Sequence, residues 1–248
     1  MSKFDIRGFF QESGKKCGLL LLIDPDRGTP DELSLRASKA EKQGADAVLI
    51  GGSFLLNDNM DASIREVKKR TNLPVIIFPG GGYQLSSAAD GLLFLSLISG
   101  RNPRWLIEEQ VYAAPRVREM GIPSIPTAYM LIGSGPATSV TYMSNTTPIP
   151  RDKNDIAIAH AIAAEYLGMQ AIYLEAGSGA SEPVPHELVR AIKAEVSLPV
   201  IVGGGIKSLD TVSDLVNAGA DFLVIGTAFE TFVDEAFLLN VAEAIHGR

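Results

Sequence analysis

The sequence predicts an α/β protein, a (β/α)8 TIM barrel that is irregular because its third helix is missing or replaced by a loop. Short leucine-rich and β-branched runs alternate with amphipathic, charge-bearing stretches, which is typical of βα units on a parallel sheet. Eight apolar runs occur in 248 residues, and this length matches a single eight-fold barrel. We therefore expect one domain over residues 1–248.

The strands are expected in the eight apolar runs, near residues 18–24, 46–51, 74–78, 91–96, 124–131, 170–175, 199–203 and 221–225. Helices are expected in the amphipathic stretches near 30–43, 60–71, 103–120, 152–167, 186–196, 208–218 and 228–246. The segment 78–90 is too short and too rich in glycine for a full helix. Gly44 and Gly219 each precede an Ala-Asp pair before a strand, so we expect both to end a helix in the left-handed conformation.

The composition argues against several classes of protein. The formal net charge of −7 disfavours a nucleic-acid partner, because a phosphate backbone is bound through clustered Lys and Arg. The longest apolar runs, near 19–23 and 92–98, are much shorter than the roughly 20 residues that span a bilayer. Cys17 is the one cysteine, so no intrachain disulfide forms, and the start of the chain is too polar for a secretory signal. We expect a cytoplasmic enzyme.

The segment 173–180 carries the strongest functional signal, because an apolar strand leads the carboxylate of Glu175 directly into a glycine-rich loop. Two later strands also end in glycines, at 203–205 and at 226. Backbone N–H groups approach an anion closely where side chains are absent, and a following helix adds the positive end of its dipole. Since barrel active sites lie at the C-terminal ends of the strands, the sequence predicts an acid or base beside a phosphate site.

Hard oxygen donors follow the first and second strands, at Asp24 and Ser53. They suit Mg²⁺, which takes only one or two protein ligands and completes its coordination shell with water and substrate phosphate. An alternative is open for the acidic segment, in which Asp24 or Asp26 instead caps the helix that begins near residues 29–31.

Five segments together carry a family resemblance, namely 23–26, 51–53, 173–180, 202–206 and 225–227. By these segments the chain resembles the geranylgeranylglyceryl phosphate synthases and their bacterial relatives, which join a polyprenyl diphosphate to sn-glycerol 1-phosphate. The resemblance covers nearly the whole chain, and segment 173–180 is its most specific mark. One branch of the family has a lysine two positions before the first-strand aspartate, where this chain has Leu22, so the chain resembles the other, longer branch.

The resemblance implies a Mg²⁺-dependent prenyltransferase that moves a geranylgeranyl group from its diphosphate to the C3 hydroxyl of sn-glycerol 1-phosphate. It implies that Asp24 and Ser53 hold Mg²⁺. It also implies that the glycerol phosphate is bound by Tyr173, Leu174, Glu175, Ala176, Gly177, Ser178, Gly179, Gly203, Gly204, Gly226 and Thr227. Without the branch-specific lysine, Lys207 or Arg27 is expected to supply positive charge.

For catalysis we hypothesise that Glu175 accepts the proton of the attacking hydroxyl, and that the Tyr173 ring faces the allylic cation. Alternatives remain open, because Glu175 could form a salt bridge in the barrel mouth and Tyr173 could be a half-buried packing residue. Two rival functions are also open. One is a flavin- or sugar-phosphate-dependent barrel enzyme, and the other is a binding protein that retains phosphate affinity without turnover.

A long prenyl tail requires an apolar groove, which we expect near residues 80–83 and 96–100 because small residues there leave room. Trp105 either packs on the barrel or anchors a subunit contact. The resemblance implies a homo-oligomer, a dimer or a hexamer. Because the product carries a long hydrocarbon chain, we also expect transient peripheral contact with a membrane.

Overall fold

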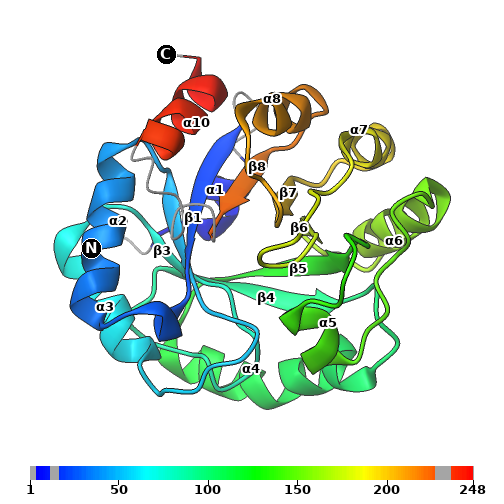
Figure 1. The fold of residues 1–248 in the computed structure, drawn as a ribbon. Helices are drawn as coiled ribbons and strands as arrows, with labels where there is room; N and C mark the ends of the chain where they lie inside the picture. Colours follow the sequence, from blue (N-terminus) through cyan, green and yellow to red (C-terminus); the bar gives the residue numbers. More distant parts are fainter. Residues whose placement is uncertain (1–3, 12–16, 227–235, 248) are drawn as a thin grey trace.

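The computed structural model describes residues 4–11, 17–226 and 236–247, and shows a closed barrel of parallel strands in the order β1 to β8 (Figure 1). The strands are β1 (Gly18–Ile23), β2 (Ala47–Ile50), β3 (Val75–Ile77), β4 (Gly91–Leu97), β5 (Ser124–Leu131), β6 (Ala171–Glu175), β7 (Val200–Gly203) and β8 (Phe222–Ile225). Each strand pairs with the next, and β1 closes the barrel by pairing with β8, where Gly18 lies opposite Phe222. The predicted TIM barrel is confirmed.

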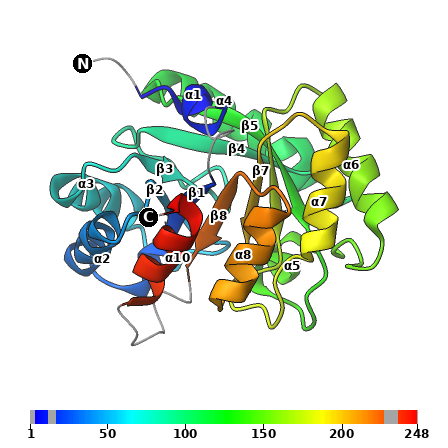
Figure 2. The same cartoon turned by 90° about the horizontal axis from the view of Figure 1, so that it is seen from above.

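Helices surround the barrel (Figures 1 and 2). They are α2 (Pro30–Lys42), α3 (Met60–Arg70), α4 (Glu109–Met120), α6 (Asn154–Tyr166), α7 (His186–Glu195), α8 (Leu209–Asn217) and α10 (Ala236–His246). These agree with the predicted helices within a few residues, except that the helix predicted from 103 begins as a π-helical turn, Arg104–Glu108. Residues 228–235 of the last predicted helix lie outside the described residues.

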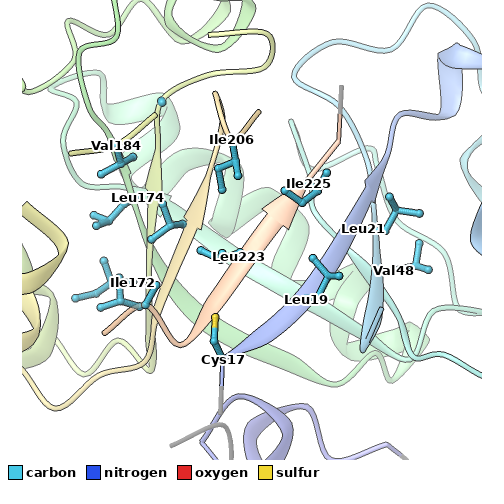
Figure 3. Close-up of a cluster of buried hydrophobic side chains, with 14 of the residues drawn as sticks. Cys17, Leu19, Leu21, Val48, Ile172, Leu174, Val184, Ile206, Leu223 and Ile225 are labelled. Atoms are coloured by element: carbon cyan, nitrogen blue, oxygen red, sulfur yellow. The ribbon is translucent and has the colours of Figure 1, made fainter. Parts of the chain in front are cut away.

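Side chains alternate between the inside and the outside of the barrel, as the period of two in a strand requires. In β1, Leu20 packs in the interior cluster, whereas Leu19 and Leu21 pack in the outer cluster between strands and helices. Figure 3 shows part of this outer cluster, with Leu174 of β6 and Leu223 of β8 among the labelled side chains.

A short helix, α1 (Ile6–Gln11), closes the N-terminal end of the barrel. Phe10 is completely buried, and its ring centroid lies 4.8 Å from that of Phe222 in an edge-on contact. Ile6 is also buried, and it packs so closely on Gly91 that a Cβ atom there would lie 2.4 Å from it. Helix α1 was not predicted from the sequence, because six residues are too few to display a helical period.

The segment between β3 and β4 is a loop, as predicted, with no helix among residues 78–90. Its Gly82 N–H donates to Oε2 of Glu109 on α4 at 2.8 Å, which holds the loop to the neighbouring helix. The predicted left-handed ends of two helices are also confirmed, with φ of +93° at Gly44 and +96° at Gly219. One further helix, α5 (Ser139–Ser144), was not predicted.

Replacing Phe10 by Ala should lower the free energy of unfolding by about 3 kcal/mol, because a fully buried ring is lost and a cavity remains beneath the barrel. Denaturant unfolding at fixed pH measures this change. Leu35→Ala is the control, since Leu35 is 50% exposed and should change the free energy by less than about 0.5 kcal/mol. A loss below about 1 kcal/mol for Phe10→Ala would show that α1 does not close the barrel.

Candidate active site

A polar pocket opens at the C-terminal ends of the strands, where barrel active sites lie. Loops that follow β1, β2, β6, β7 and β8 form most of its wall. The predicted metal and substrate residues that line it are Asp24, Ser53, Tyr173, Glu175, Ser178, Gly179, Gly204 and Gly226. The fold therefore gathers in one place residues that are as many as 202 positions apart along the chain, from Asp24 to Gly226.

Some predicted substrate residues lie elsewhere. Leu174 and Ala176 belong to the outer hydrophobic cluster, where Figure 3 shows the Leu174 side chain, because they alternate with Tyr173 and Glu175 along the chain. They can therefore meet a substrate in the pocket only through their backbone. Gly177 and Gly203 lie next to pocket residues without lining the pocket themselves. Thr227 lies outside the described residues.

Glu175 ends β6 with its carboxyl group buried, since only 5% of the residue is exposed. Its Oε1 accepts a hydrogen bond from the Gly177 N–H at 2.6 Å. Burial raises the pKa of Glu175 from 4.5 to about 7, and the Gly177 N–H and the nearby Tyr173 and Tyr129 hydroxyls offset part of the increase. Its described partners are these polar groups rather than the cation of a salt bridge. A carboxyl group that titrates near neutral pH is suited to proton transfer.

Three aromatic rings line the same pocket beside Glu175. Phe78 stacks on Tyr173 with centroids 4.9 Å apart, and the Tyr129 ring lies edge-on to Tyr173 at 5.4 Å. Burial, with the nearby Glu175 charge, raises the pKa of both tyrosines well above the usual range, so both hydroxyls stay protonated.

Tyr173 is completely buried, not half-buried as in the packing alternative. Its hydroxyl has no hydrogen-bond partner of good geometry among the described residues, so it acts on the Glu175 carboxyl group as a nearby dipole. One face of its ring is covered by Phe78. The Tyr173 hydroxyl is thus a buried polar group at the pocket that can still form a hydrogen bond with a bound molecule.

Glycine is required where β7 meets the end of β6. A Cβ atom on Gly203 would lie 2.3 Å from the Tyr173 hydroxyl oxygen. A Cβ atom on Gly204, where φ is +84°, would lie 2.5 Å from Oε1 of Glu175. Since no other residue fits these contacts, the glycines predicted to cradle phosphate also leave the space in which Tyr173 and Glu175 lie.

The two open interpretations of the acidic segment after β1 are resolved in part by its hydrogen bonds. Thr29 caps α2 through a capping box with Glu32, so neither aspartate does so. Asp24 instead caps the short 3₁₀ turn Pro25–Arg27, because its Oδ1 accepts from the Asp26 N–H at 3.0 Å. Burial raises the pKa of Asp24, while this N–H and the Arg27 guanidinium at 3.8 Å oppose the increase.

Asp26 has a different role, because its carboxylate crosses to the loop after β2. Its oxygens accept from the backbone N–H of Leu56 at 2.5 Å and of Asn57 at 3.2 Å, and these hydrogen bonds lower its pKa. The loop that carries Ser53 is thereby attached to the loop that carries Asp24.

The donor set at this edge fits Mg²⁺. Asp24 and Ser53 both line the polar pocket, and the Asp24 side chain is 32% exposed, so its carboxylate can share a cation with water and an anionic substrate. No cluster of three or more His, Cys, Asp and Glu ligands is found in the described part of the chain. Mg²⁺ does not require such a cluster, in contrast to Zn²⁺.

Two basic side chains border the pocket, Lys207 and Arg27. The Lys207 ammonium donates to the Ala180 carbonyl at 2.7 Å, which directs it toward the glycine-rich loop after β6. Arg27 lies beside Asp24, after β1. Positive charge is thus available at two places around the pocket mouth.

An apolar groove adjoins the polar pocket, and the two share the residues Gly52, Ser53, Phe78, Tyr129 and Val140. The groove lies between the loop 78–90 and α4, where the third helix is missing, and it holds about 830 Å³ of empty space including its mouth. Its apolar wall includes Leu85, Leu92, Phe94, Leu95, Leu97, Trp105, Ala113 and Met143. Of the small residues predicted to leave room for a tail, Gly80, Gly81 and Gly82 line the groove.

Phe78 and Val140 were not assigned to the site from the sequence, whereas Tyr129 was expected at the C-terminal end of the fifth strand but was given no role. A signal existed for Tyr129, because it pairs directly with Tyr173 across β5 and β6 and therefore points the same way into the barrel. Trp105 lines the apolar groove and carries the Arg104 guanidinium 4.9 Å above its ring. Its predicted part in a subunit contact stays a prediction.

The polar pocket and the apolar groove meet at Ser53 and Tyr129, so one ligand with an anionic head and a long apolar tail fits across both. Together with the barrel, this arrangement defines a phosphate-binding TIM-barrel enzyme for such a substrate. The chain belongs to the PcrB family, whose sequence profile matches residues 12–245.

Individual relatives confirm the resemblance seen in the sequence. The chain is 46% identical over 220 residues to the geranylgeranylglyceryl phosphate synthase of Flavobacterium johnsoniae, which covers 89% of this chain and 90% of that protein. It is 41% identical over 245 residues to the enzyme of the same name from Methanosphaera stadtmanae, covering 98% and 100%. The structure of (S)-3-O-geranylgeranylglyceryl phosphate synthase from Thermoplasma acidophilum in complex with sn-glycerol-1-phosphate matches with a TM-score of 0.93 at 34% identity, covering 99% of this chain and 100% of that one.

Within the described residues, every helix is too short or too polar to cross a membrane.

The three histidines do not line the polar pocket. The His246 ring lies 3.0 Å from Asp46, and the His160 ring lies 3.3 Å from Arg101. His186 lies 3.0 Å from Glu187 on α7.

Glu175→Gln should stabilise the protein at high pH and change its stability little at low pH. The pKa of Glu175 is about 7 in the folded chain, and its ordinary value is 4.5. Folding therefore takes up a proton between these two pH values, and wild-type stability falls as pH rises through that window. Above it the wild type must keep a buried charge, which glutamine lacks. Melting temperatures at about pH 4.5 and about pH 8.5 measure the difference.

Glu187→Gln is the matched control, because the Glu187 side chain is 62% exposed. It should show no such pH-dependent gain. An equal effect of Glu175→Gln at both pH values would contradict the raised pKa.

Proposed function

We propose that this chain is a geranylgeranylglyceryl phosphate synthase, which transfers a geranylgeranyl group from its diphosphate to the C3 hydroxyl of sn-glycerol 1-phosphate. The carbon–oxygen bond of the prenyl diphosphate breaks, an ether bond forms, diphosphate leaves, and the hydroxyl proton passes to the enzyme. The meeting of a polar pocket and an apolar groove near Glu175 carries this proposal. It favours the synthase over a flavin or sugar-phosphate enzyme, because neither rival needs a long apolar groove.

The glycerol phosphate is proposed to bind at the ends of β6, β7 and β8. Ser178, Gly179, Gly204 and Gly226 line the pocket there and offer backbone groups that a phosphate can approach closely. The adjacent members of the predicted set, Leu174, Ala176, Gly177, Gly203 and Thr227, are proposed to contribute through the backbone or by shaping the loops. Lys207 is the nearest proposed source of positive charge, because its ammonium is held at the glycine-rich loop.

Mg²⁺ is the proposed cofactor, held by Asp24 and Ser53. When bound, it would neutralise the negative charge that develops on the departing diphosphate. The exposed part of the Asp24 carboxylate and the position of Ser53 at the junction of pocket and groove support this assignment. The prenyl tail would extend from that junction into the apolar groove.

Glu175 is the proposed general base. Its carboxylate accepts the proton of the attacking C3 hydroxyl as the ether bond forms, and its pKa of about 7 places it near the pH at which such a base is most effective. The Gly177 N–H holds this carboxylate, and the protonated hydroxyls of Tyr173 and Tyr129 lie near it. Tyr173 is also proposed to stabilise the allylic cation from the pocket wall, where Phe78 covers one face of its ring.

Three wider features are proposed with the reaction. The chain is proposed to form a homo-oligomer, a dimer or a hexamer, and the apolar side chains exposed at the start of α4 and before it support a subunit contact, with Ile107 57%, Val111 60% and Tyr112 77% exposed. It is proposed to work in the cytoplasm and to touch a membrane transiently when the product leaves.

The function is tested by incubating the purified chain with Mg²⁺, geranylgeranyl diphosphate and sn-glycerol 1-phosphate, and by following diphosphate release and product mass. We expect an ether product that requires Mg²⁺ and is not formed from the sn-3 enantiomer. EDTA and the enantiomer are the controls. A folded protein that forms no product with any prenyl diphosphate would refute the proposal.

Glu175→Gln should lower kcat by about 10²-fold or more, because glutamine cannot accept the hydroxyl proton. The wild-type kcat/KM should rise with pH and level off above about 7, since only the carboxylate is active and it forms as pH passes its pKa. The variant should lose this rise. Glu187→Gln on the exposed face of α7 is the control, and near-normal turnover by Glu175→Gln would rule out the base assignment.

A further inference from the structure

Gln84 lies in the loop that replaces the third helix, and its side chain is completely buried. Burying an amide is unfavourable unless its hydrogen-bonding groups find partners. Here they do. Oε1 accepts from the N–H of Gly80 at 3.1 Å and of Gly52 at 3.4 Å, while Nε2 donates to the Gly52 carbonyl at 2.8 Å and to the Tyr83 hydroxyl at 3.3 Å.

These partners fix the orientation of the amide. If oxygen and nitrogen were exchanged, the NH₂ group would face two backbone N–H donors and the oxygen would face the Gly52 carbonyl. The amide therefore binds both the N–H and the carbonyl of Gly52, as a paired strand would. It joins the loop after β2 to the loop after β3 in one arrangement.

The two loops touch backbone to backbone at this point. A Cβ atom on Gly80 would lie 2.1 Å from the Gly52 carbonyl oxygen, and one on Gly51 would lie 1.9 Å from the Phe78 carbonyl oxygen. Glycine permits the contact, but it provides no side chain to hold it. Gln84 is the side chain that holds Gly52 and Gly80 together.

The position of this contact gives it a functional meaning. Gly52 directly precedes Ser53, the proposed Mg²⁺ ligand, and it lines both the polar pocket and the apolar groove. Gly80 lines the groove wall on the other side of the contact. Gln84 thus lies behind the place where an anionic head would continue into an apolar tail.

We propose that Gln84 is a positioning residue for the prenyl diphosphate: it holds the Ser53 loop and the groove wall in register, so that the head and the tail of this substrate bind together. The inference rests on the proposed function. It concerns only one of the two substrates, because the glycerol phosphate residues come from β6, β7 and β8, whose loops make no hydrogen bond with Gln84 among the described residues.

Gln84→Met tests the proposal, because methionine keeps the length and packing of glutamine and removes its four hydrogen bonds. We expect the KM for geranylgeranyl diphosphate and the Mg²⁺ concentration for half-maximal rate each to rise by about 10-fold or more. The KM for sn-glycerol 1-phosphate should change by less than about 2-fold. A general loss of folding would reduce the amount of active enzyme and leave both KM values unchanged.

Gly80→Ala is the second variant, since its added methyl group forces the loops apart without altering Gln84. It should show the same selective rise, and it keeps the proposal testable if Gln84→Met does not fold. Gln170→Met is the matched control, because Gln170 is a partly buried glutamine just before β6, at the opposite end of the barrel. It should leave both KM values at the wild-type level.

If both KM values rise equally, or if neither changes, the proposed role of Gln84 is wrong. The proposed function still stands in that case, provided that the wild-type protein turns over its substrates. A wild-type protein without turnover would instead refute the proposed function, and this inference with it. Calorimetric binding of sn-glycerol 1-phosphate to Gln84→Met gives an independent readout, and we expect wild-type affinity. Weakened binding would count against the proposal.

Discussion

One electrostatic constraint shapes the centre of this protein: the Glu175 carboxyl group must be withdrawn from water without being paired to a cation. Burial alone would keep it protonated at neutral pH, whereas a salt bridge would make it a weak base. In the structure, burial raises the pKa of Glu175, and the Gly177 N–H and two nearby tyrosine hydroxyls offset part of this increase. Gly203 ends β7 and Gly204 follows it, and a Cβ atom at either position would collide with Tyr173 or Glu175. These glycines thus leave room for Glu175, the proposed base, as well as for the proposed phosphate site.

Packing around Glu175 is tight, whereas the absence of a helix after β3 leaves open space beside the barrel. In a regular barrel the helix after β3 would cover the strands beside α4. Here a glycine-rich loop takes its place, and an apolar groove runs beside it into the same region as the polar pocket. The two proposed substrates would therefore enter from different sides and meet near Tyr129. Backbone N–H groups of the loop donate hydrogen bonds to Gln84 and Glu109, so the groove has a defined wall.

Local patterns predicted most of the fold, because apolar runs and amphipathic helices are recorded in neighbouring residues. The loop at 78–90 was predicted for the same reason, since its glycines disfavour a helix. Short elements such as α1 and α5 were missed because six residues carry too little periodicity. At the site, the motif around Glu175 was visible in the sequence, whereas Phe78 and Gln84 join it only through tertiary contacts. Leu174 was included with the pocket because a motif does not show which of its residues point outward.

The pairing of β1 with β8 has a consequence for how the protein is made. These strands are joined side by side although Leu20 and Val224 are separated by almost the entire chain. Asp24 follows the first of them and Gly226 follows the second, so two neighbouring parts of the pocket wall come from distant parts of the polypeptide. During synthesis the ribosome releases the part with Asp24 first and the part with Gly226 last. An emerging chain therefore carries no complete pocket, and ligands of the finished enzyme can stabilise it only after the last strand has closed the ring.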